Sequence, residues 1–297
     1  MADKRVCFDF EIEFSNGGGI QGQGFRLDIQ GDDIDDDALA AHIVDDMRLL
    51  MVGSVRIVNK RIVEERHKRA EAAEQIVAAG SAVYDLSHDI VDGMITYKGL
   101  PAPLVCDHLT RERSRGIYAE GTEFQIGRID MVANTGTYID TPFHRYADGH
   151  DLAGLALERV ADVPGIVVRV EGMHGSAIDW HAFAPLDVSG KAVLVQTGWD
   201  RHWGTDAYFE GHPFLTEAAA KWLRDKGALV VGIDSYNIDD VSTGMRPVHS
   251  VLLDAGIPIV EHLTGLAPVP AEGFRFTAVP PKVRGMGTFP VRAYAKM

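Results

Sequence analysis

Residues 227–234 read GALVVGID, a short apolar run that follows a glycine and ends on an acidic residue. The run has the length of one buried strand, far below the roughly 20 apolar residues of a membrane-spanning helix. Before it, TEAAAKWLRDKG at 216–227 has the composition of a helix that closes on glycine. A second such pair follows, with HSVLLDAG at 249–256 and IPIVEHL at 257–263. Strands that alternate with helices indicate an α/β domain.

Three further strand-length runs extend this pattern: GIVVRV at 165–170, AVLVQTG at 192–198 and FRFTAVP at 274–280. Glycine and proline turns separate them. We therefore expect residues 81–297 to form one domain, of a size that a single core can support. Upstream, residues 64–80 are charged and then rich in alanine, which predicts a helical connector.

The first part of the chain has a different pattern. Residues 5–14, RVCFDFEIEF, alternate apolar and polar side chains, as a half-buried strand does. A glycine-dense stretch at 15–24 predicts a turn, and FRLDIQG at 25–31 alternates again. After one helical segment, SVRIVNKRIV at 54–63 returns to the strand pattern. Residues 1–63 therefore predict a small α+β domain with ββαβ order, of unknown role.

The segment 32–51 is the expected helix of this small domain. Its aspartates can cap the start of the helix, and Leu39, Ile43, Met47 and Leu50 share one helical face. The same aspartates resemble a calcium loop only superficially, because the central glycine and the terminal glutamate of such a loop are missing. We therefore interpret them as capping residues.

Composition excludes several classes of partner. The chain has 297 residues, 46% of them hydrophobic, and a formal net charge of −14. It has no cluster of basic residues that could neutralise a row of phosphates, so we expect no nucleic-acid partner and no membrane partner. The first ten residues lack the apolar stretch of a secretory signal, and Cys7 and Cys106 have no metal-binding spacing. A cytoplasmic protein with reduced thiols is expected.

The stretch NTGTYIDTPFH at 134–144 is the main candidate for chemistry. Its Asp140 and His144, like His249 and Glu261 further on, lie beside apolar strands or turns. A carboxylate or imidazole in such a place needs a partner, and these ligand types suit zinc or manganese. Spacing alone also allows a structural interpretation, in which His249 caps a helix and Glu261 pairs with an arginine.

The same stretch resembles the signature of the cyclase family, which includes bacterial arylformamidase (kynurenine formamidase) and isatin hydrolase. That signature reads His-x-Gly-Thr-His-x-Asp-x-Pro-x-His. The resemblance covers about residues 82–295 and rests on several ordered segments. They are YDLSHDIVDGMITYKGLPAP at 84–103, VGIDSYNIDD at 231–240, HSVLLDAGIPIVEHLTGL at 249–266 and FRFTAVPPKVRGMGTFPVRAYA at 274–295.

The resemblance implies a fold, a set of roles and an assembly. The fold would be the family's swivelling β/β/α domain built on a mixed sheet, and members of the family are usually homodimers or homotetramers. Asp140 would be a metal ligand, His249 and Glu261 would bind the same ion, and His144 would be the general acid and base. The small-molecule substrate would be a cyclic or aryl amide, a formamide or a lactone.

The chain departs from the family signature at two positions. The first two signature histidines, both ligands of a first metal ion in the family, are replaced by Asn134 and Tyr138. A neutral amide oxygen is a weak ligand, and a phenol with an ordinary pKa near 10 binds well only when deprotonated. We therefore expect one divalent ion at most, held by the second set of ligands.

Three functional hypotheses remain open at this stage. In the first, one zinc or manganese ion activates water, and His144 completes hydrolysis. In the second, Asp140, Tyr138 and His144 form a metal-independent cyclase, isomerase or lyase. In the third, the pocket binds a ligand without turning it over. For the substrate we expect contacts from His88, Asn134, Trp199 and Arg145, although Arg145 could instead hold Asp148.

Overall fold

The computed structural model describes residues 4–29, 31–47, 49–64, 82–170 and 176–297. The chain divides into two compact units, residues 1–80 and 81–297, which we describe separately. The helical connector expected over 64–80 lies, apart from Glu64, outside the described residues.

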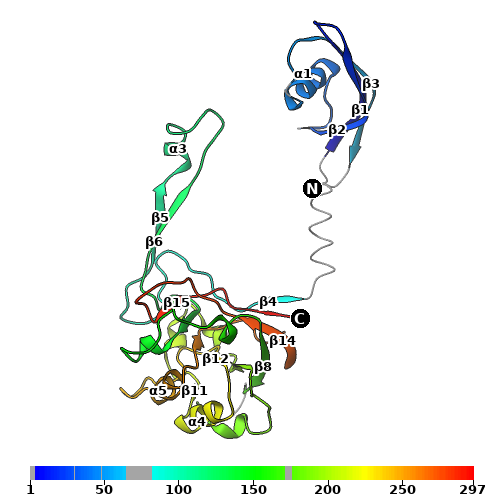
Figure 1. The fold of residues 1–297 in the computed structure, drawn as a ribbon. Helices are drawn as coiled ribbons and strands as arrows, with labels where there is room; N and C mark the ends of the chain where they lie inside the picture. The colour runs from blue at the N-terminus through cyan, green and yellow to red at the C-terminus, as the bar shows by residue number, and fades with distance from the viewer. Residues whose placement is uncertain (1–3, 30, 48, 65–81, 171–175) are drawn as a thin grey trace. The chain divides into compact units, whose positions relative to one another are not determined.

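The first unit is a three-stranded antiparallel sheet with one helix (Figure 1). The strand order is β2-β1-β3, and α1 follows β2 in the chain. Leu39 and Ile43 of α1 are fully buried and pack with Val6, Phe8 and Ile12 of β1. The bounds are Lys4–Phe14 for β1, Gly19–Asp28 for β2, Asp36–Asp46 for α1 and Val52–Glu64 for β3.

Two details of this unit differ from the sequence prediction. The predicted turn at 15–24 is shorter, because β2 already begins at Gly19. Gly22 belongs to this strand and leaves room for the Phe10 ring, which a side chain at position 22 would strike. The predicted helix also extends too far along the chain. α1 ends at Asp46, so Met47 and Leu50 do not continue its buried apolar face, and they are 36% and 82% exposed. The capping prediction is confirmed, since the Asp35 carboxylate accepts from Ala38 N.

The second unit is built on a nine-stranded mixed sheet with the order β15-β7-β13-β12-β10-β8-β14-β16-β4. β8, β10, β12 and β13 run parallel, and the flanking strands pair antiparallel. The strands of this sheet are β4 Val83–Asp85, β7 Tyr138–Asp140, β8 Val163–Arg169, β10 Ala192–Gln196, β12 Val230–Ile233, β13 Ile259–Glu261, β14 Glu272–Thr277, β15 Thr288–Pro290 and β16 Tyr294–Lys296.

Apolar clusters cover both faces of the parallel strands. On one face, α4 (Glu217–Asp225) and α5 (Pro247–Asp254) pack against alternate side chains such as Val193 and Val231. On the other face, Leu194 and Val260 pack with side chains from the antiparallel strands. This two-sided burial explains why these strands read as continuous apolar runs in the sequence. The prediction of an α/β domain with a mixed sheet is confirmed.

The remaining elements of the second unit are short. The two-residue strands β9 (Ala177–Ile178) and β11 (Phe214–Leu215) pair with each other. The single-turn helices are η1 Pro142–His144, η2 Leu157–Arg159, η3 Trp180–Ala182, η4 Trp199–His202 and η5 Asp206–Phe209.

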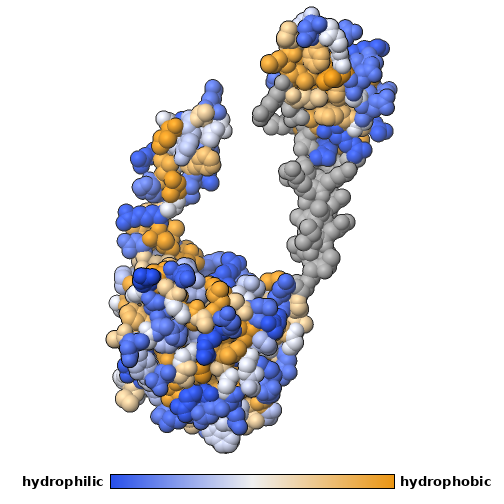
Figure 2. Space-filling view, viewed as in Figure 1, coloured by the Kyte–Doolittle hydropathy of each residue, from blue (hydrophilic) through white to orange (hydrophobic). Residues whose placement is uncertain are grey.

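The strands β5 (Leu104–Leu109) and β6 (Ile126–Asp130) form a separate antiparallel ribbon, with α3 (Arg111–Ser114) between them. Apolar side chains gather on this ribbon without cover from the chain's described residues (Figure 2). Leu104, Val105, Ile126 and Ile129 are each about half exposed. Among the described residues, no helix has both the length and the apolar character needed to span a bilayer.

Candidate metal centre and active site

The register of three neighbouring strands brings the candidate residues together. β7 lies between β13 and β15, and its Cα pairing sets Tyr138 opposite Glu261 and Asp140 opposite Thr288. Side chains of directly paired residues lie on the same face of a sheet, so both pairs are in contact. Two segments of chain more than 100 residues apart therefore meet at β7.

His249 is oriented by Asp239, a residue that the sequence analysis did not single out. α5 begins at Pro247, and the Asp239 carboxylate accepts from Val248 N at 2.7 Å and from His249 N at 3.0 Å. The same carboxylate lies 2.6 Å from His249 Nδ1. A carboxylate that holds one imidazole nitrogen leaves the other, Nε2, for a ligand. The alternative that His249 itself caps the helix is wrong, since His249 lies within the first turn.

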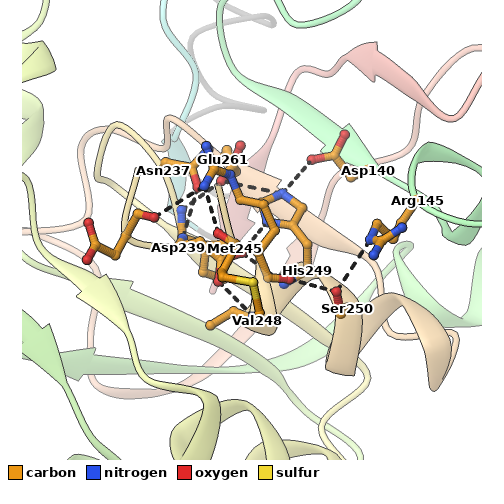
Figure 3. A network of polar contacts seen from close by, with 12 residues as sticks. Asp140, Arg145, Asn237, Asp239, Met245, Val248, His249, Ser250 and Glu261 are labelled. Atoms are coloured by element: carbon orange, nitrogen blue, oxygen red, sulfur yellow. Dashed lines mark hydrogen bonds and ion pairs between the residues drawn. The ribbon is translucent and has the colours of Figure 1, made fainter. Parts of the chain in front are cut away.

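Two carboxylates face the free nitrogen of His249 (Figure 3). Asp140 Oδ2 lies 3.7 Å and Glu261 Oε1 lies 3.8 Å from His249 Nε2. Asp140 Oδ2 is buried and has no hydrogen-bond partner within the described residues. Ligand atoms about 2.1 Å from a tetrahedral ion lie roughly 3.4 Å apart, so small shifts would admit an ion between these groups. The unpartnered Asp140 oxygen and the mixed oxygen–nitrogen donor set thus fit a divalent metal.

Asp140, His144 and His249 each offer one possible ligand atom, and these atoms lie within 4.8 Å of one another. The set expected from the sequence had Glu261 in place of His144. Glu261 already accepts from Tyr138 and from Ile238 N, the latter at 2.7 Å, which engages both of its oxygens. The alternative in which Glu261 pairs with an arginine is wrong for the described residues. Glu261 as a ligand stays a prediction.

Electrostatics indicate that this pocket requires a positive charge. Burial disfavours the charged form of His249, but the carboxylates of Asp140, Asp239 and Glu261 outweigh burial and raise its pKa to about 10. Burial likewise raises the pKa of Glu261. For Asp140, burial is outweighed by His144, His249 and Thr288, which lower its pKa. Without a metal, a proton on His249 offsets the buried carboxylates; a divalent ion can take the same role.

His144 belongs to a hydrogen-bonded chain that also includes Thr288, a second residue missed from the sequence. Thr288 Oγ1 donates to Asp140 Oδ1 and lies 2.8 Å from His144 Nδ1. Because the only hydroxyl proton of Thr288 goes to Asp140, His144 Nδ1 acts as the donor to Thr288. This arrangement leaves His144 Nε2 as the nitrogen that can take up a proton.

Tyr138 is engaged as a hydrogen-bond donor. Its phenol donates to Glu261 Oε2 at 2.6 Å, and the side chain is only 1% exposed. Burial and the neighbouring carboxylates of Glu261 and Asp140 raise the pKa of Tyr138 well above its usual value. A neutral phenol is a poor metal ligand, and a weakened first metal position stays a prediction.

A cavity of about 610 Å³ opens onto these residues. This volume suits a small molecule. Asn134, Tyr138, His144, His249 and Glu261 line its polar side. Apolar contacts are supplied by Tyr97, Leu100, Met245 and Val251.

Of the expected substrate-binding residues, Asn134 and Arg145 line this cavity, whereas His88 and Trp199 do not. His88 stacks on Trp203, with ring centroids 3.9 Å apart. The Trp199 indole donates to Tyr208 O at 2.9 Å. Both side chains are therefore engaged in packing, and neither position could have been inferred from the local sequence.

The comparisons with known proteins identify the family of the chain. Residues 84–240 match the model of the family described as Putative cyclase. The kynurenine formamidase of Geobacillus thermodenitrificans is 31% identical over 184 residues, covering 61% of this chain and 84% of that protein. The kynurenine formamidase of Salinibacter ruber is 30% identical over 178 residues, covering 57% of this chain and 78% of that protein.

Solved structures share the fold. A predicted metal-dependent hydrolase from Bacillus stearothermophilus has a TM-score of 0.57 and 29% identity, over 72% of this chain and 98% of that one. An isatin hydrolase bound to thioisatinate has a TM-score of 0.63 over 77% of this chain and 97% of that one, and at 18% identity this likeness concerns the fold alone. The chain belongs to the cyclase family, and the family predicted from the sequence is confirmed. Its named relatives are hydrolases, which is the enzymatic class that the sequence predicts.

Proposed function

We propose that this protein is a metal-dependent hydrolase of a small aryl or cyclic amide, a formamide or a lactone. The observation that carries the proposal is the unpartnered Asp140 Oδ2, which faces His249 Nε2 beside a cavity of about 610 Å³. The kynurenine formamidase relatives support the amide substrate class. Asp140 and His249 would hold the ion, with Glu261 as a third ligand.

A bound zinc or manganese ion would supply Lewis acidity, which lowers the pKa of water and polarises a carbonyl group. The protein's own residues supply proton transfer and orientation. His144, with Nδ1 held by Thr288, can accept a proton at Nε2 and return it to the leaving nitrogen or oxygen. Asp140 fixes Thr288, and through it the tautomer of His144.

Asn237 is positioned to bind the substrate's carbonyl oxygen. Its Oδ1 accepts from Asp239 N at 2.9 Å, which leaves the amide NH2 group as a donor at the cavity wall. Donors placed before the reaction stabilise the negative charge that develops on a carbonyl oxygen. Asn134 lines the same wall and offers a second neutral polar group.

Metal analysis with a matched activity assay tests the proposal. We expect about one zinc or manganese ion per chain by inductively coupled plasma mass spectrometry, and hydrolysis of formanilide or an analogue that stops on chelation. Stoichiometric metal should be lost in Asp140→Asn. Turnover that ignores chelators would contradict the proposal and favour the metal-independent hypothesis. Ligand binding with neither metal nor turnover would favour a binding protein.

We further propose that the chain forms a homo-oligomer through the β5–β6 ribbon. An isolated two-stranded ribbon is marginally stable in water, and this one exposes Leu104, Val105, Ile126 and Ile129. A second copy of the chain would cover these side chains. The substrate itself would be a small molecule, because the cavity volume of about 610 Å³ suits one.

A further inference from the structure

Arg145 lines the cavity and has no carboxylate partner among the described residues. It directly follows His144 at the end of η1 and lines the same cavity as His144 and His249. The sequence offered Asp148 as a partner, but within the described residues no carboxylate lies within 4.0 Å of the Arg145 guanidinium. Arg145 is exposed, so solvent stabilises its charge, and the guanidinium is available to a ligand beside the candidate reaction centre.

The other charged side chains of the cavity are already engaged. Arg246 Nη1 donates to three backbone carbonyl groups, those of Asp240, Thr243 and Met245, and so secures its own loop. The Glu217 carboxylate lies 2.6 Å from Lys221 Nζ. Arg145 differs from these two residues because its only side-chain hydrogen bond to the described residues is made through Nε.

Two local contacts of Arg145 favour one orientation of its side chain. Its Nε donates to Ser250 Oγ at 3.4 Å, and Ser250 Oγ in turn donates to Arg246 O at 2.7 Å (Figure 3). Its guanidinium also lies 5.3 Å from the centre of the Tyr146 ring. Because the contact with Ser250 uses Nε, the two Nη groups of the planar guanidinium are left to donate to a ligand. Such a fork matches the two oxygens of a carboxylate.

We propose that the substrate is an aryl or cyclic amide that carries a carboxylate, and that Arg145 binds this carboxylate while His144 faces the scissile bond. The inference rests on the proposed function and specifies its substrate class. The apolar wall formed by Tyr97, Leu100 and Val251 would contact the ring. Ser250 is a positioning residue for Arg145.

The test uses four aryl formamides with the metal-loaded protein: 2-, 3- and 4-formamidobenzoate, and formanilide, which lacks the carboxylate. We expect the wild type to prefer at least one of the acids over formanilide. Arg145→Gln should lower kcat/KM for that acid by about 10- to 100-fold, mainly through KM, and should lower kcat/KM for formanilide by a much smaller factor. Arg145→Lys should recover only part of the loss, because an ammonium group cannot bind in the bidentate manner.

Arg224→Gln is the matched control, since Arg224 lies on α4 outside the cavity lining and is 40% exposed. It should leave all four rates unchanged. An equal loss for the acids and formanilide in Arg145→Gln would overturn the inference, as would a wild type that shows no preference for an acid. Unchanged melting temperature and metal content in Arg145→Gln would exclude misfolding.

A binding measurement separates failure of this inference from failure of the proposed function. Calorimetry with 2-, 3- and 4-aminobenzoate, compared with aniline, reports anion binding without turnover. Binding that Arg145→Gln weakens about 10-fold or more, in a protein that hydrolyses none of the formamides, would support the anion site and contradict the hydrolase. Absence of both turnover and Arg145-dependent binding would overturn the carboxylate site and the proposed hydrolase function together.

Discussion

The phenol of Tyr138 donates a 2.6 Å hydrogen bond to Glu261 Oε2, and both side chains are buried. In the family signature the position of Tyr138 is the second histidine, which the resemblance gives as a metal ligand. Here the residue at that position satisfies a carboxylate instead. The contact follows from the pairing of β7 with β13, which sets the two residues opposite each other.

Removing this phenol should destabilise the protein. Tyr138→Phe leaves a buried carboxylate oxygen without its donor, and we expect the free energy of unfolding to fall by about 1–3 kcal/mol in the absence of metal. Urea denaturation after chelation measures this change. Tyr118→Phe, at a side chain that is 40% exposed, is the control and should change stability by less than about 0.5 kcal/mol. Equal stability of the two variants would contradict the prediction.

The unpartnered oxygen of Asp140 should be necessary for metal binding. Asp140→Asn removes a charge from the ligand set, and we expect metal content to fall from about one ion per chain to a small fraction of that value. Chelation should lower the melting temperature of the wild type but not of the variant. Asp225→Asn, on an exposed carboxylate beside Arg224, should keep full metal content. A fully loaded Asp140→Asn protein would show that the ion lies elsewhere.

Thr288 should matter for turnover although it does not line the cavity. Thr288→Val breaks the chain between Asp140 and His144, so His144 loses the contact that fixes its tautomer. We expect kcat to fall by about 10- to 100-fold with metal content retained. His144→Ala should cost about 100-fold or more. Thr122→Val, at an exposed position, should have no effect; a loss of the same size there would argue for a general effect of the substitution.

Stability should decrease in acid because of His88. Burial lowers the pKa of His88 to about 4, and its buried Nε2 has no partner within the described residues. The unfolded chain then binds the proton more tightly than the native state, so stability is lost as the pH falls from about 6.5 to 4, by at most about 3 kcal/mol. His88→Phe keeps a ring on Trp203 and should show less loss of melting temperature over this range. His181→Phe, on an exposed ring, should follow the wild type; parallel curves for all three proteins would contradict the prediction.

The β5–β6 ribbon should control assembly. Val105 and Ile129 are paired across the two strands and are 45% and 48% exposed. We expect the double variant Val105→Lys/Ile129→Lys to lower the mass measured by light scattering from that of an oligomer to that of one chain. Leu157→Lys, an equally exposed apolar position outside the ribbon, should leave the mass unchanged. A monomeric wild type would refute the proposed assembly.

Local sequence determined the α/β class and most element types. The apolar runs around 192–196 and 230–233 predict buried strands because parallel strands covered on both faces need apolar side chains at every position. Gly227 and Gly256 marked the ends of α4 and α5, since both have the positive φ that glycine adopts without strain. The sequence also indicated Asp140, His144, His249 and Glu261 as carriers of chemistry.

Only the tertiary structure decided how these residues act. The partner of each side chain is set by strand register and by helix placement, which join segments over 100 residues apart and leave no local pattern in the sequence. Asp239 and Thr288, which orient His249 and His144, are ordinary polar residues in the sequence and acquire their roles only through these contacts. The lack of a carboxylate partner for Arg145 among the described residues is likewise a property of the fold, because an arginine's partners depend on what packs around it.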